Sequence, residues 1–83
     1  SSNSQEQIHE IVFTGLSRHP QAWVNQLHQA SSLADAEWVA QLINELPQSD
    51  AQLATALTKL ARGFRCDLIA ELSAKSITEN LNL

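Results

Sequence analysis

Two stretches decide the fold of this chain of 83 residues: WVNQLHQASSLADAEWVAQLINELP at residues 23–47 and AQLATALTKLARGFRCDLIAEL at residues 51–72. In both, apolar residues recur three or four positions apart, the spacing that places side chains on one face of a helix. No run alternates with period two between turn residues, as a half-buried strand would. The two stretches therefore predict helices and no sheet.

The apolar pattern of the whole chain predicts five helices. They cover residues 5–14, 20–33, 35–46, 49–63 and 65–74. The connections between them are short, and short links make neighbouring helices antiparallel. We therefore predict an all-α fold, a compact antiparallel bundle of four to five short helices.

The centre of the bundle is expected at Leu57. This residue lies in the middle of an apolar stripe formed with Leu53, Leu60 and Phe64. A stripe of this width faces the core in a globular helix. We expect Leu57 to be fully buried.

Several residues predict where these helices begin and end. The residues at 4–7 and 49–52 fit capping boxes, in which a serine side chain and a glutamine side chain satisfy free backbone N–H groups. Gly15 and Gly63 are predicted left-handed stops, and Phe64 is expected to pack back on the helix as the apolar contact of such a stop.

The chain divides into three parts by the same criteria. We expect residues 1–4 to be a tag or linker remnant and residues 5–75 to form the helical bundle domain. Residues 76–83 are expected to form a frayed C-terminal tail, because Asn80 and Asn82 are poor helix formers.

Composition limits the partners and the compartment. Five Lys and Arg residues against nine Asp and Glu residues give a net charge of -4, which argues against a nucleic-acid partner. No run approaches the roughly 20 apolar residues that span a bilayer, and no signal peptide is visible, so we expect no membrane partner. The single cysteine, Cys66, fits a reducing compartment, and we expect a cytoplasmic protein.

The residues that could perform chemistry do not form a recognisable set. Of the histidines His9, His19 and His28, the first and the last lie on predicted helices, and neither has the second ligand four positions away that a zinc-binding helix needs. No residue of the predicted helices supplies a nucleophile elbow or an oxyanion hole. We expect no catalytic residue, no metal, no cofactor and no small-molecule substrate.

A possible interaction surface is formed by Trp38, Lys59, Arg62 and Arg65. Trp38 lies off the apolar stripe of its own helix, so it is either a core filler or an anchor for a partner, a role in which tryptophan is enriched. Lys59, Arg62 and Arg65 are the only basic cluster of the chain. A solvated helix end is the usual explanation of such a cluster and is favoured over a nucleic-acid contact.

From residue 23 to residue 72, the chain resembles the C-terminal helical module of cyanobacterial hybrid (multi-sensor) histidine kinases. The resemblance rests on residues 27–30 with Asp35, Leu42 and Ile43 before Pro47, and on Leu53, Ala56, Leu57 and Leu60 with the turn at residues 64–67 before Ile69. The resemblance implies a two-component signalling protein in which this module follows sensor, kinase and receiver domains and is not itself catalytic.

The favoured hypothesis is a non-catalytic C-terminal protein-interaction module that binds a receiver domain, a kinase domain of the parent protein, or itself. One alternative is a histidine phosphotransfer-like domain that uses His28 as phosphoacceptor. The segment LHQASS at residues 27–32 resembles the phosphorylated helix of such domains, but Gln29 and Ala30 stand where Lys and Gly normally follow the histidine. A second alternative is a docking domain of a multi-enzyme assembly.

Overall fold

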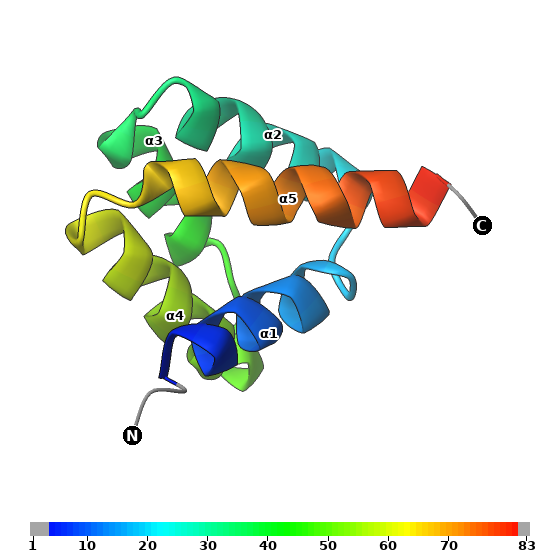
Figure 1. Cartoon of the computed structure of the whole chain (residues 1–83), viewed down its shortest axis with the longest axis horizontal. Coiled ribbons are helices and arrows are strands. Elements are labelled where there is room, and N and C mark those ends of the chain that lie inside the picture. The colour runs from blue at the N-terminus through cyan, green and yellow to red at the C-terminus, as the bar shows by residue number, and fades with distance from the viewer. Residues whose placement is uncertain (1–3, 82–83) are drawn as a thin grey trace.

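The computed structural model describes residues 4–81 and is helical nearly throughout (Figure 1). Its elements are α1 (Ser4–Leu16), α2 (Gln21–Ser32), α3 (Ala36–Asn44), the 3-10 turn η1 (Gln48–Asp50), α4 (Ala51–Arg62) and α5 (Cys66–Leu81). No strand occurs among the described residues. The predicted all-α fold of short helices is therefore confirmed.

Helix α5 runs through the middle of the fold. In Figure 1 it lies between α2 on one side and α1 on the other, and it packs against both. α2 and α5 run side by side in opposite directions. α3 folds back on α2 and also contacts α4, which in turn packs on α1 and α5. α3 and α4 thus lie next to each other, with α2 packed on α3 and with α1 and α5 packed on α4.

The apolar stripes of the helices meet in one core. Leu57 is 0% exposed, as predicted, and so is Leu27 on α2. Fully burying a leucine side chain contributes about 1.5–3 kcal/mol, so these stripes are the main source of stability. The other core residues exposed by 1% or less are Val12, Leu16, Val24, Ala30, Val39, Leu42, Leu53 and Ile69.

Gly15 does not end the first helix, contrary to the prediction. α1 continues through it to Leu16, and no glycine of the chain has a positive φ. A Cβ atom at position 15 would lie 2.9 Å from Cδ1 of Leu53 on α4. The residue is therefore a glycine because α1 and α4 approach closely here. The capping box predicted at residues 4–7 lies outside the described residues, because the side chain of Ser4 is not described.

The turns after α2 and α4 have the same hydrogen bonds. Asp35 N donates to Ala30 O at 2.9 Å, and Arg65 N donates to Leu60 O at 2.8 Å. This six-to-one bond defines a Schellman motif, which places the next-to-last residue of the turn in the left-handed region. That residue is Ala34 in the first turn and Phe64 in the second, with φ of 54° and 59°.

The stop at Gly63 was therefore predicted one residue too early. Gly63 is the C-cap of α4 with φ of −84°, and Phe64 takes the left-handed conformation instead. The side chain of Phe64 is 93% exposed, so the predicted packing of Phe64 back on the helix is also wrong. Helical periodicity no longer applies to Phe64, because the helix has already ended.

The start of α4 differs from the predicted capping box at residues 49–52. Its N-cap is Asp50, which makes no capping hydrogen bond with its side chain. The Asp50 carboxylate instead pairs with Nε2 of His19 at 2.5 Å, and Arg18 lies 3.7 Å away. This carboxylate therefore ties the α1–α2 connection to the start of α4.

Helix α5 ends later than predicted. It continues past Ala74 to Leu81, and Ser76 is 2% exposed while Ile77 packs against the core. Residues 76–81 thus belong to the helix and not to a frayed tail, since burial against the core outweighs their weak helix propensity. Residues 1–3 and 82–83 lie outside the described residues, and the division at residues 4 and 75 otherwise stays a prediction. No helix between residues 4 and 81 is long and apolar enough to cross a bilayer.

Candidate interaction surface

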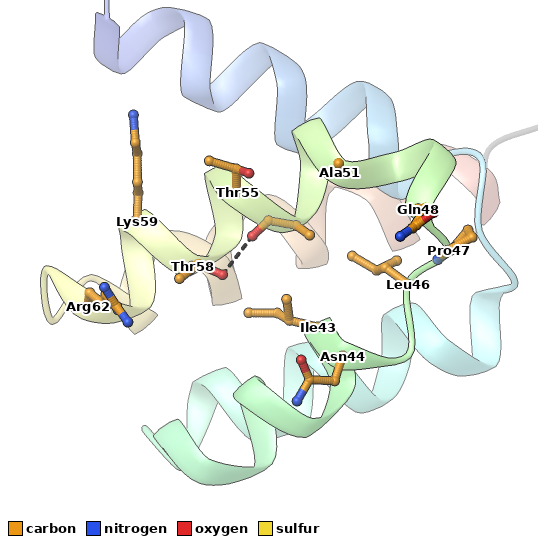
Figure 2. A pocket seen from close by; sticks show the side chains of 11 residues that line it. Ile43, Asn44, Leu46, Pro47, Gln48, Ala51, Thr55, Thr58, Lys59 and Arg62 are labelled. Carbon is orange, nitrogen blue, oxygen red and sulfur yellow. Dashed lines mark hydrogen bonds between the residues drawn. The ribbon is translucent and has the colours of Figure 1, made fainter.

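An open pocket of about 530 Å³ lies between the end of α3, η1 and α4 (Figure 2). In Figure 2, Ile43 and Leu46 reach from α3 and the turn after it toward α4. The wall on the α4 side consists of small side chains, Ala51, Ala54, Thr55 and Thr58. Small residues on one wall and branched apolar residues on the other leave a shallow, mostly apolar hollow.

A second hollow of about 510 Å³ continues the first one toward the other end of α4. The two share Ile43, Asn44, Thr58 and Arg62, so they form one surface depression, which we call the α3–α4 groove. The residues that only the second hollow contributes are Ala36, Ala40, Ala61 and Phe64.

The groove offers few free hydrogen-bonding groups on its α4 wall. The Thr58 hydroxyl donates to the backbone oxygen of Ala54 at 2.7 Å, drawn as the dashed line in Figure 2. The backbone groups of α3 and α4 are bonded within their helices, which is the normal state of a helix interior. An occupant of the groove would therefore meet methyl groups more than polar ones.

Two cationic side chains, Lys59 and Arg62, line one end of the groove, although Lys59 extends away from α3 in Figure 2 and also lines the hollow between α1 and α4. Both line the first hollow and stand at its end away from Pro47 and Gln48 (Figure 2). Neither forms an ion pair with a carboxylate in the part of the chain whose side chains are described. No described carboxylate lines either hollow. The predicted basic residues Lys59 and Arg62 therefore lie together on one apolar depression.

The third predicted cation, Arg65, does not line the groove. Its Nε donates to Oδ1 of Asp67 at 3.2 Å, with both side chains exposed. This hydrogen bond is the main reason why the pKa of Asp67 is lowered from its ordinary value of 3.8. Arg65 thus carries its own partner and is less available for another one.

Phe64 is a groove residue that the sequence wrongly predicted to pack against its helix. It is the most exposed large apolar side chain of the described residues, and Leu33 at 65% is the other. A non-glycine residue in the left-handed region costs roughly 1–2 kcal/mol, and an exposed phenyl ring returns no burial energy. The sequence signal that could have identified it is its position directly after the helix stop.

Trp38 lies away from the groove. It is two residues from Ala36 and from Ala40, which places it near the opposite side of α3. The side chain is half-buried and packs against the core, and its backbone N–H donates to the Asp35 carboxylate at 3.1 Å. This bond makes Asp35 the N-cap of α3, whereas the role of Trp38 in an interaction stays a prediction.

His28 connects α2 to α5 within the fold. Its Nδ1 lies 3.0 Å from the backbone oxygen of Ala70 and 3.3 Å from Oγ of Ser73. The contact with a carbonyl oxygen means that Nδ1 carries the proton. Among the described residues, the hydrogen bonds of the ring involve neither lysine nor arginine. These bonds hold the ring against α5, as in a structural contact between helices.

The remaining histidines do not form a site either. His19 pairs with Asp50 and its ring centroid lies 5.3 Å from that of Trp23, while Nε2 of His9 is buried without a partner. Within residues 4–81 no group of three or more His, Cys, Asp or Glu residues is placed to hold a metal ion.

A family model described as the hybrid histidine kinase-response regulator C-terminal domain matches residues 4–74. The chain belongs to this family. The match includes α1, whereas the resemblance noted from the sequence covered only residues 23–72. No curated protein and no solved structure matches the chain. Membership of this family of C-terminal domains assigns the chain to hybrid histidine kinase-response regulator proteins and thus to two-component signalling.

Proposed function

We propose that this domain is a non-catalytic protein-interaction module of a cytoplasmic hybrid histidine kinase, of the multi-sensor type found in cyanobacteria. Its partner is a receiver or kinase domain of the parent protein, or a second copy of the module. The proposal is carried by the α3–α4 groove, an apolar depression with two cations that have no carboxylate partner among the described side chains, and with an exposed Phe64 at its end. Exposed apolar surface rimmed by polar groups is typical of protein-binding sites.

The family supports this proposal by its position in the parent protein. A C-terminal domain of a hybrid kinase follows the kinase and receiver domains, which transfer the phosphoryl group. The described helices of this domain supply no set of residues arranged for phosphoryl transfer. The half-buried ring of His28 is held by a backbone carbonyl on α5, which suits a structural contact. A module of this kind acts by bringing other domains together.

The test is a titration of the ¹⁵N-labelled chain with the receiver domain and, separately, with the kinase domain of a hybrid histidine kinase. We expect amide shifts that saturate with at least one of them. Self-association is measured in the same samples by dilution. No saturating shift with either domain and no change on dilution would reject the proposal.

A phosphorylation control separates this proposal from a phosphotransfer role. The chain is incubated with a phosphorylated receiver domain and assayed for acid-labile phosphate, with His28→Gln as the matched variant. We expect no phosphate label on the wild-type chain or on the His28→Gln variant. A label on the wild type that is absent from His28→Gln would replace the interaction role by phosphotransfer.

A further inference from the structure

We propose that the α3–α4 groove binds an amphipathic helix of a partner protein, with acidic side chains flanking the apolar face of that helix. This inference rests on the proposed function and adds the surface and the chemistry of the partner. It follows from three features of the groove: the bonding state of its walls, the size of its lining side chains, and its charge.

The walls of the groove favour a helix over an extended segment. Both walls are helices whose backbone groups bond internally, so they offer no open edge to which a strand could add. The lining of alanines and threonines lets another helix come close. Ile43 and Phe64 then provide apolar contacts along its length, as in recognition of a helix in a groove.

The charge of the groove selects the partner. The whole chain carries a net charge of -4, yet the groove is lined by Lys59 and Arg62 and by no described carboxylate. Complementary potential across an interface favours a partner with carboxylates beside its apolar face. A second copy that presents the same groove would bring the cations of both copies together, because a two-fold interface uses one patch twice. An acidic helix from another protein is therefore the better occupant.

Phe64 supplies the anchor at one end. Its ring is exposed, and its backbone is held in the left-handed region by the bond from Arg65 N to Leu60 O, which fixes where the ring starts. A large aromatic side chain on a fixed backbone loses little conformational entropy when it binds. Such residues are typical hot spots of interfaces.

The experiment uses two synthetic peptides of about 18 residues, long enough for five helical turns. They share the same leucines at helical spacing, and one has glutamates beside the leucine face where the other has lysines. Each is titrated into the ¹⁵N-labelled chain at low and at high salt. We expect the glutamate peptide to bind at least about tenfold more tightly than the lysine peptide at low salt, with shifts at Ala40, Thr58 and Ala61.

Variants decide whether the groove carries this preference. The double charge reversal Lys59→Glu with Arg62→Glu is expected to favour the lysine peptide instead, and Phe64→Ala to weaken both peptides. Lys75→Glu, an exposed charge reversal on α5, serves as the matched control and should keep the original preference. Circular dichroism spectra that match the wild type show that each variant is folded.

Two results would overturn the proposal. The first is equal or absent binding of the two peptides, or shifts that cluster away from α3 and α4. The second is concentration-dependent shifts of the groove residues without any peptide, which would assign the groove to a second copy. A receiver or kinase domain that binds another face would reject the groove and leave the proposed function standing.

Discussion

The hairpins α2–α3 and α4–α5 have the same backbone plan but different side chains at its key positions. α2 begins at Gln21 and α4 at Ala51, while α3 begins at Ala36 and α5 at Cys66, so equivalent positions lie 30 residues apart. Both hairpins turn through a Schellman motif with a non-glycine residue in the left-handed region. The chain thus uses one local structure twice.

The difference between the two turns lies in what surrounds that residue. The first turn has the small residue Ala34, followed by Asp35, whose carboxylate accepts a hydrogen bond from Trp38 N and caps α3. The second has Phe64, followed by Arg65, which cannot cap a helix start because it has no acceptor. The first turn therefore serves stability, and the second gives up a cap and exposes an aromatic ring at the end of the groove.

The largest expected effect tests the feature that the two hairpins share. Leu27 and Leu57 occupy equivalent positions and are both 0% exposed. Leu27→Ala and Leu57→Ala should each lower the free energy of unfolding by about 2–5 kcal/mol. A domain of this size has little more than that in total, so Leu57→Ala should be largely unfolded or molten at 37 °C. Thermal melts followed by circular dichroism measure the effect.

The control for these melts is Gln41→Ala on the exposed side of α3. It should change the free energy of unfolding by less than about 0.5 kcal/mol. Equal midpoints for Leu57→Ala and Gln41→Ala would mean that the stripe of α4 is not the core.

The second effect separates the two turns. Asp35→Ala should lower the free energy of unfolding by about 1 kcal/mol, the usual cost of removing a helix cap. Arg65→Ala at the equivalent position should change it by less than about 0.5 kcal/mol, because its side chain is exposed and makes no cap. Urea unfolding curves, fitted with one m-value for both variants, measure the two free energies of unfolding. Equal losses in the two would contradict the different use of the turns.

The third effect concerns the left-handed residues. Ala34→Gly and Phe64→Gly should each raise the free energy of unfolding by about 0.5 kcal/mol, because relief of 1–2 kcal/mol of backbone strain outweighs the added chain entropy of glycine. The same urea series measures these variants. A loss above about 1 kcal/mol in Phe64→Gly alone would show that the phenyl ring packs within the fold after all.

The local features of this fold could be predicted from sequence because their signals are local. The apolar spacing around Leu57 identified the core stripe. The helix ends predicted at Gly15 and Ala74 were wrong, because α1 continues to Leu16 and α5 to Leu81 through contacts that are not local in the sequence. Gly15 is required by the close approach of Leu53, 38 positions further along the chain, and the last turns of α5 are held by the packing of Ile77 against the core.

The groove was even less visible in the sequence. Its walls come from α3 and α4, and most of the residues in them are ordinary alanines, threonines or an isoleucine of an amphipathic helix. Lys59 and Arg62 were identified from charge alone, but the sequence did not show that they border an apolar depression. Phe64 was assigned to the core, because its spacing from Leu60 is helical although the helix stops between them.

The smallest expected effect is electrostatic. The hydrogen bond from Arg65 lowers the pKa of Asp67 below 3.8, so the ionised carboxylate favours the folded state at higher pH. This contribution is lost as the pH falls through the lowered pKa, because the carboxyl group is then protonated in both states. In Arg65→Ala the pKa of Asp67 should rise toward 3.8, as measured by an NMR titration of its side chain. An unchanged pKa would show that Arg65 is not its cause.

The central claim is that the second turn was adapted for a partner and the first was not. The most direct measurement is the affinity of the wild type, Phe64→Ala and Leu33→Ala for the receiver or kinase domain that binds, by isothermal titration calorimetry. Phe64 and Leu33 are the two exposed large apolar residues of the described chain, one at each turn. We predict that Phe64→Ala weakens binding at least about tenfold and that Leu33→Ala changes it by less than about twofold. Equal effects of the two substitutions, or no effect of Phe64→Ala, would contradict the claim.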